Sequence, residues 1–213
     1  MDRSELRERL RTLSGVLMDT LLTDQEADAF LNEAYLALCG LAEWSFLYDE
    51  VATSASSDTT GLPGSLGRVQ AVLAGGRALQ RRDTLELARY PQSRQTGEPW
   101  AWAPVGDDAI RVFPTPEEPT EVEVRGWIDV APMASDAAEP LFASEFHAAV
   151  AYEAAANVLE SEGDDSGRSE RYRGEVMAYL DRMARRYLPD GGQVSYPPAP
   201  TRVRGEGEEG DEA

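Results

Sequence analysis

The sequence contains no lysine, so all 20 positive charges are arginines, and 39 acidic residues bring the net charge to -19 at pH 7. This balance argues against nonspecific binding to DNA or to anionic lipid. An acidic surface repels both over a Debye length of about 8 Å at physiological salt.

Cysteine and long apolar runs are also scarce. The single cysteine, Cys39, excludes an internal disulfide framework and is typical of a reducing compartment. No apolar run approaches the ~18 residues that span a bilayer, and no charged start precedes an apolar signal core. We therefore expect a protein that is soluble and intracellular when it is made, without membrane contact.

Residues with catalytic chemistry are too isolated to predict an enzyme. His147 is the only histidine, and no Cys/His cluster or HExxH spacing accompanies it, so we expect a packed or capping role. Cys39 lies on an apolar helical stripe and is interpreted as a small buried hydrophobic residue. Three acidic pairs lack the pattern of a calcium loop and are interpreted as solvated turns: Asp107-Asp108, Glu117-Glu118 and Asp164-Asp165. We predict no catalytic residue, no metal and no cofactor.

Two helices are predicted near the start of the chain. Hydrophobic residues make up 42% of 213 residues, enough for one core or for one core and a small satellite. A leucine stripe predicts a helix over residues 2–19, and Thr23 with Glu26 forms a capping box before a second stripe that ends at Gly40. The stripe consists of Leu6, Leu10, Leu13 and Leu17.

Two more helices are predicted in the second half, over residues 144–160 and 168–187, with a break at 163–167. From Pro189 the chain is rich in proline, glycine and glutamate and shows no periodicity. We expect this tail to be extended or disordered on its own.

Between the two helical regions the pattern changes to period two. Trp44, Phe46 and Tyr48 alternate and predict the first strand, and Gly75-Gly76 predicts a turn between two strands. Residues 121–128 alternate again, and a short helical turn is expected over 83–90. Roughly six short strands at hairpin spacing predict a small antiparallel sandwich or barrel.

These patterns predict an α+β protein: a helical bundle from the N- and C-terminal helices, with an inserted small antiparallel β-domain and an extended C-terminal tail. We expect residues 1–43 to hold the N-terminal helices and 44–139 the inserted β-sandwich or barrel. Residues 140–188 should hold the C-terminal helices, and 189–213 the acidic tail.

Three segments resemble head-to-tail adaptor (connector) proteins of tailed bacteriophages, of the tail tubular protein A type. The family's second helix is similar to LNEAYLALCGLAEW, from Leu31 to Trp44. Its Leu-Pro entry into the β-domain is similar to LPGSLGRVQAV, from Leu62 to Val72. Its Pro-x-aromatic-His helix opening is similar to PLFASEFHAAVAYEAA, which follows the Phe113-Pro114-x-Pro116 ribbon. The chain departs from the family in its long acidic tail and in its alanine-rich helix over 144–160.

The resemblance implies a structural ring subunit without enzymatic activity. Family members form a dodecameric ring beneath the portal protein and provide the docking surface for the tail or for a stopper protein. The implied location is the neck of the virion, and the host cytoplasm during assembly. DNA is then only cargo in the channel, where an acidic wall repels phosphate and avoids salt-dependent adhesion.

On the portal side, the expected interface residues come from the last helix and the tail, because the family's C-terminal segment lies against the portal. They are Arg182, Arg185, Arg186, Tyr187 and Tyr196. The arginines are also favourable at a helix C-terminus, where the interaction of each positive charge with the helix dipole stabilises the helix by about 0.3–1 kcal/mol.

On the subunit or tail side, the expected interface residues are tryptophans. A small sandwich cannot easily bury four of them, and tryptophan is enriched at interfaces. Burial in the core is the alternative. The four are Trp44, Trp100, Trp102 and Trp127.

Three other functions stay open at the level of sequence. Another neck or tail-completion protein, such as a stopper, is the nearest alternative, but such proteins usually lack a split bundle with an inserted β-domain. A small metal hydrolase that uses clustered carboxylates would be stabilised by a divalent ion. A monomeric binding module whose acidic tail mimics nucleic acid would bind a basic partner and form no ring.

Overall fold

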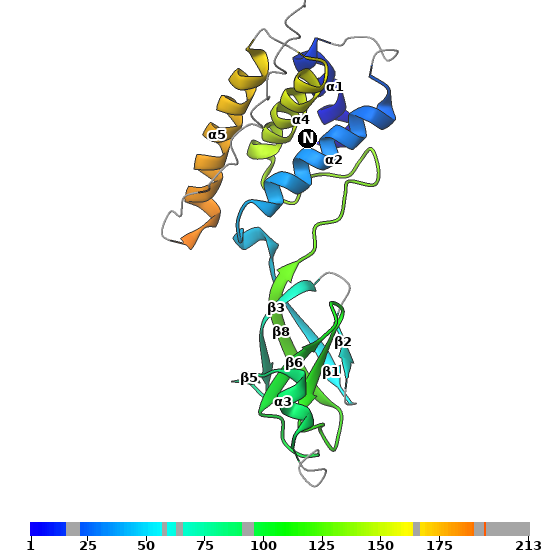
Figure 1. Ribbon diagram of the computed structural model, residues 1–213, viewed down its shortest axis with the longest axis vertical. Helices are drawn as coiled ribbons and strands as arrows, with labels where there is room; N and C mark the ends of the chain where they lie inside the picture. Colours follow the sequence, from blue (N-terminus) through cyan, green and yellow to red (C-terminus); the bar gives the residue numbers. More distant parts are fainter. Residues whose placement is uncertain are drawn as a thin grey trace, which may run out of the picture.

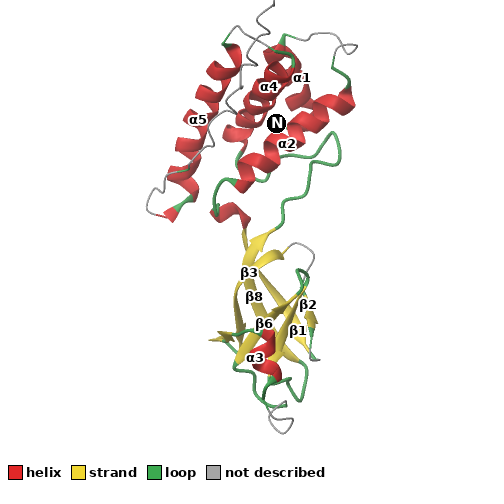
Figure 2. Ribbon diagram, viewed as in Figure 1, coloured by secondary structure: helices red, strands yellow, loops and turns green. Residues whose placement is uncertain are grey.

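The chain forms two bodies along one long axis. Helices from both ends of the chain make a bundle, and strands from its middle make a β-domain (Figures 1 and 2). The predicted α+β class with an inserted β-domain is therefore confirmed. The structure, a computed structural model, describes residues 1–15, 22–56, 59–62, 66–90, 96–163, 167–189 and 194. Apart from Pro189 and Val194, the predicted tail lies outside these residues.

One helix occupies the centre of the bundle. It is α4, whose residues are mostly buried because α5 packs on one side of it and the α1–α2 pair on the other (Figure 1). Its many alanines keep the side chains short, so that three helices can approach it closely. The four bundle helices share one hydrophobic core. They are α1 (Arg3–Ser14), α2 (Asp24–Gly40), α4 (His147–Ser161) and α5 (Arg168–Tyr187).

Local capping explains where α1 and α2 begin and where α1 ends. Asp2 and Thr23 each accept a hydrogen bond from the backbone N–H three residues later, and each helix has a reciprocal glutamate. The prediction that the first helix continues to residue 19 is wrong. It ends at Ser14, because Gly15 adopts a φ of 78° and its N–H bonds the carbonyl of Arg11. Leu17 lies outside the described residues.

The predicted strand over Trp44–Tyr48 is wrong except at its last residue. Residues Ser45–Leu47 form a short 3-10 helix, η1, and β1 begins at Tyr48. The indole Nε1–H of Trp44 donates to the carbonyl oxygen of Leu38 at 3.0 Å and holds the chain against the end of α2. The alternation of aromatic residues does not reveal this contact, because it depends on the packed bundle.

The β-domain consists of two four-stranded sheets. Sheet A has the order β1-β8-β3-β4 and sheet B the order β2-β7-β6-β5. The strand pairs are antiparallel except for β5–β6, which is parallel and departs from the predicted all-antiparallel domain. The strands are β1 (Tyr48–Ala55), β2 (Thr60–Gly61), β3 (Leu66–Ala74), β4 (Arg77–Ala78), β5 (Gln80–Arg81), β6 (Ala101–Val105), β7 (Ala109–Phe113) and β8 (Thr120–Ile128).

Each face of sheet B contributes to a separate apolar cluster. Its inner face packs on sheet A around Trp102, Val72 and Val124. Its outer face is covered by the short helix α3 (Thr84–Ala88), whose Leu87 packs in a second cluster with Ala101, Ala103 and Phe113. The turn at Gly75-Gly76 and the short helical turn over 83–90 are therefore both found where the sequence predicts them.

The return segment, residues 129–143, leads from β8 back to the bundle and is bonded to α1. The backbone N–H of Arg3 donates to the carbonyl oxygen of Ala138 at 2.8 Å. The side chains of Arg3 and Arg7 donate to Asp136 at 2.9 and 2.8 Å, and these bonds hold the pKa of Asp136 below its usual value. The segment then enters η3 (Ser144–Phe146), which is continuous with α4.

Candidate functional site

His147 is a packing residue of the bundle. Its side chain is 1% exposed at the start of α4. Nε2 lies 2.8 Å from the carbonyl oxygen of Phe142. Nδ1 lies 2.8 Å from both the amino nitrogen and the carbonyl oxygen of Met1. Both ring nitrogens are engaged within the fold, which confirms the packed role.

Cys39 is free and buried in the bundle core. Burial raises the pKa of its thiol to about 12, so the reactive thiolate does not form near neutral pH. The interpretation of Cys39 as a small buried hydrophobic residue is confirmed. The same burial raises the pKa of its neighbour Tyr35, whose hydroxyl accepts a hydrogen bond from the N–H of Leu141.

The two acidic pairs within the described residues lie in a turn and a bend. Asp107-Asp108 lies in the turn between β6 and β7, and Glu117-Glu118 in the loop before β8. Asp164-Asp165 falls outside the described residues. In the described part of the chain, no three Asp, Glu, His or Cys side chains converge to hold a metal ion. No helix there is long and apolar enough to span a bilayer.

Two of the four tryptophans belong to the hydrophobic cores. Trp44 is 0% exposed in the bundle, and Trp102 is 1% exposed between the two sheets. This corrects the expectation that they lie at an interface, because neither ring has surface left to contact a neighbour. The alternative, burial in the core, applies to both. A small sandwich needs to bury only Trp102, since Trp44 packs with the helices.

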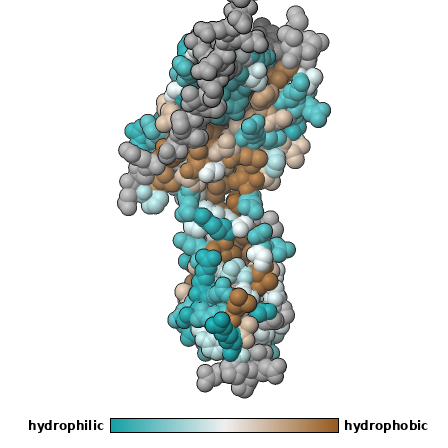
Figure 3. All heavy atoms as spheres, viewed as in Figure 1, coloured by the Kyte–Doolittle hydropathy of each residue, from teal (hydrophilic) through white to brown (hydrophobic). Residues whose placement is uncertain are grey.

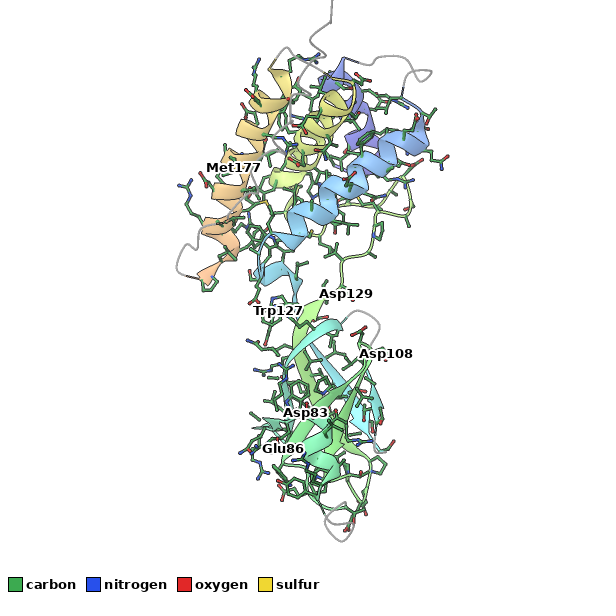
Figure 4. All side chains as sticks on the ribbon, viewed as in Figure 1. Asp83, Glu86, Asp108, Trp127, Asp129 and Met177 are labelled. Atoms are coloured by element: carbon green, nitrogen blue, oxygen red, sulfur yellow. The ribbon has the colours of Figure 1, made fainter. Side chains whose placement is uncertain are left out.

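The other two tryptophans are partly exposed. Trp127 lies at the junction between the bundle and the β-domain, close to Asp129 (Figure 4). The ring centroid of Tyr48 is 5.5 Å from that of Trp127, and the guanidinium of Arg68 lies 4.3 Å over the indole. Trp100 packs edge-on against Tyr90 beside α3, at 5.6 Å between ring centroids. The interface role of Trp100 and Trp127 stays a prediction.

The predicted portal-side arginines lie together on the last turns of α5. This end of the bundle is the one nearest the β-domain (Figure 1). Arg182, Arg185 and Arg186 are exposed and border a hollow of approximately 340 Å³. Tyr187 is partly buried, packs against Phe46 at 4.8 Å between ring centroids, and therefore also serves the bundle core.

Two residues at the same hollow were not predicted. They are Glu145 and Phe146, which border it from η3. Glu145 forms an ion pair with Arg186. Local sequence patterns do not reveal this neighbourhood, because the two sides of the hollow are about 40 residues apart and meet only when α4 and α5 pack. The remaining predicted portal-side residue, Tyr196, lies outside the described residues.

Hydrophobic surface also gathers at this end of the bundle. Figure 3 shows apolar residues on the bundle surface next to the β-domain. Leu141 in the return segment is 50% exposed; the other strongly exposed large apolar side chain of the described residues, Leu85 at 73%, is on α3 of the β-domain. An apolar area beside exposed arginines has the composition of a protein interface, where aromatic residues and arginine are enriched.

Comparison with known proteins assigns the chain to a family. The model of the SU10 adaptor protein family matches residues 1–204, which is nearly the whole chain. A search of curated proteins finds no matching relative. The match extends beyond the three segments of resemblance and includes all bundle helices and all strands. The chain therefore belongs to the SU10 adaptor protein family and is a structural, adaptor-type protein of the phage neck.

Proposed function

We propose that this chain is one subunit of an oligomeric ring, a dodecamer of the tail tubular protein A type, that lies beneath the phage portal. In this role it joins the portal to the tail or to a stopper protein, and DNA passes through the ring as cargo. The protein performs no catalysis and uses no cofactor.

The observation that carries the proposal is the separation of the hydrophobic cores. The bundle core and the core between the sheets lie at opposite ends of the long axis (Figure 1). Among the described residues, only Ile128 packs against both. Two bodies with independent cores can each bind a different neighbour without disturbing the other. This is the property that a subunit between two assemblies requires.

We assign the two bodies to different partners. The bundle, from residues 1–43 and 140–188, faces the portal through the arginine end of α5 and the tail over 189–213. The β-domain, within residues 44–139, faces the neighbouring subunit or the tail. Trp100 and Trp127 are the tryptophans with surface available for that contact.

The test is negative-stain imaging of the protein mixed with the portal ring from the same genome. We expect a cylindrical extension below the portal, and we expect it to be lost when residues 190–213 are deleted. An extension that survives the deletion would keep the adaptor role and place the portal contact on α5. If the full-length protein does not associate with the portal, the proposed function is wrong. Circular dichroism of the deletion variant provides the folding control.

A further inference from the structure

The hollow at the end of α5 is a cationic site on an acidic protein. Among the described residues that line it, three are exposed arginines and one, Glu145, is a carboxylate. The chain as a whole carries a net charge of -19. A local excess of positive charge on such a surface attracts an anionic group to one place, while the rest of the surface repels it.

Two of the three arginines have guanidinium groups available for a partner. Arg186 pairs with Glu145 and lies over the ring of Tyr187, 5.4 Å from its centroid. Arg182 and Arg185 each use only Nε, which donates to a backbone carbonyl of the preceding turn at 3.3 and 3.1 Å. Within the described ranges, neither of these two forms an ion pair.

The orientation of Arg182 is already set. Its guanidinium lies over the ring of Tyr179, 4.3 Å from the centroid. Stacking on an aromatic face reduces the rotamer freedom that a long side chain loses when it binds. A planar carboxylate can accept two parallel hydrogen bonds from the terminal nitrogens of an arginine held in this way.

A helix start adds to the positive potential. The helix formed by η3 and α4 begins at Ser144, and neither part has a side-chain cap at its N-terminus. The helix dipole places partial positive charge at such a start, where the N–H of Phe146 already donates to the carbonyl oxygen of Ala143 at 2.9 Å. Glu145 and Phe146, which line the hollow, belong to this first turn.

We propose that this hollow binds the carboxylates of an acidic segment in the protein that docks on the portal side. The inference rests on the proposed function and adds the chemistry of the partner. The hollow has room for one or two side chains. Duplex DNA carries one charge per about 1.7 Å and would extend its phosphates along the acidic surface around the site. A short acidic peptide places a few carboxylates on the arginines and avoids that repulsion.

The test compares two double variants with the same change in charge. The first is Arg182→Gln with Arg185→Gln, and the control is Arg89→Gln with Arg171→Gln. Both control arginines are also exposed, and they lie away from the hollow. Glutamine retains good helix propensity, and circular dichroism verifies that all proteins are folded.

The first measurement is fluorescence anisotropy with a fluorescein-labelled hexaglutamate peptide. We expect the wild type to bind it and to bind more weakly at about 200 mM salt than at about 50 mM. The affinity should fall about tenfold or more in the Arg182/Arg185 variant and stay within about twofold in the control variant. Equal binding by both variants, absence of wild-type binding, or tighter binding of a short duplex DNA would each overturn the inference.

The second measurement is association with the portal ring, and it separates the inference from the proposed function. If the wild type and the Arg182/Arg185 variant join the portal equally well, the acidic-segment inference is wrong and the adaptor role stands. If the wild type does not join the portal, the adaptor role fails, and the peptide titration alone decides whether the hollow binds carboxylates.

Discussion

Gly126 of β8 lies very close to the backbone of the neighbouring strand β3. A Cβ atom at this position would lie 2.2 Å from the carbonyl oxygen of Arg68 and 3.0 Å from the Cα of Val69. These are backbone atoms of the neighbouring strand, beside the irregular register of β3. They cannot rotate away, so any larger residue must move the two strands apart.

We expect Gly126→Ala to lower the free energy of unfolding by about 1–3 kcal/mol through this overpacking. The matched control is Gly174→Ala on the exposed side of α5, where, apart from the adjoining backbone of the helix itself, no described atom lies within 4 Å of the new Cβ. That change should raise the free energy of unfolding by about 0.5–1 kcal/mol, because alanine has the higher helix propensity. Urea denaturation followed by tryptophan fluorescence and circular dichroism measures both. Effects of the same sign would contradict the steric argument.

At the residue scale, the sequence predicts whether a side chain has catalytic partners better than it predicts whether that side chain is exposed. The isolation of His147 and Cys39 from catalytic partners is visible in the chain, and both are packed residues in the fold. The sequence does not show which tryptophans are buried, because exposure depends on which elements pack together. Trp102 faces the opposite sheet, whereas Trp127, at a similar apolar position of a strand, lies on the outer side at the junction.

One arginine of α5 contacts two carboxylates of α4. Arg173 of α5 makes a bidentate contact with Glu160, with Nε and Nη2 at 2.9 and 2.7 Å from the two carboxylate oxygens. Its Nη1 also lies 3.5 Å from Glu153, which is only 6% exposed. The arginine therefore offsets two carboxylates that lie about two turns apart on the central helix.

Arg173→Met should lower the free energy of unfolding by about 2–3 kcal/mol, because Glu153 stays buried and loses this positive charge. Thermal and urea unfolding, followed by the helical circular dichroism signal, measures the loss. Arg171→Met, at an exposed position of the same helix, should change the stability by at most about 0.5 kcal/mol. If the two substitutions prove equivalent, the contact with α4 does not stabilise the bundle.

At the element scale, features set by interactions between residues close in sequence are predicted correctly, and features set by long-range packing are not. The start of α2 and the whole of α5 lie where the sequence places them, since capping boxes and apolar stripes act over a few residues. The 3-10 helix η1 was missed, because the hydrogen bond from Trp44 to Leu38 and the bundle core decide its conformation. The end of α1 was also mispredicted: the leucine stripe continues beyond Gly15, but the local cap at Gly15 ends the helix.

At the scale of the molecule, the β-domain is attached to the bundle by two adjacent segments. Tyr48 at the start of β1 lies opposite Trp127 near the end of β8 in the antiparallel register. Opposed Cα atoms in such pairs are about 4.5–5.5 Å apart. The two attachment points are thus close enough to be joined directly, without stretching the bundle.

We expect the bundle to fold without the β-domain. In the test variant, Asn-Gly replaces residues 49–126 and connects Tyr48 to Trp127 as a two-residue hairpin turn. The four helices retain a complete core, because the apolar clusters of the β-domain share only Ile128 with it among the described residues. Circular dichroism should show a higher helical fraction and a cooperative thermal transition. An aggregated chain, or one without a cooperative transition, would show that the two bodies depend on each other.

The sequence by itself determined the succession of a helical, a strand-rich and a second helical region, the α+β class, the lack of a recognisable catalytic motif and the acidic character of the surface. These properties follow from composition, periodicity and local capping, which act along the chain. Only the tertiary structure decided which tryptophans are buried, and that Glu145 and Phe146 join Arg182 and Arg185 around one hollow. The physical reason is that burial and charge clustering depend on which helix faces pack together, and that packing joins residues far apart in the sequence.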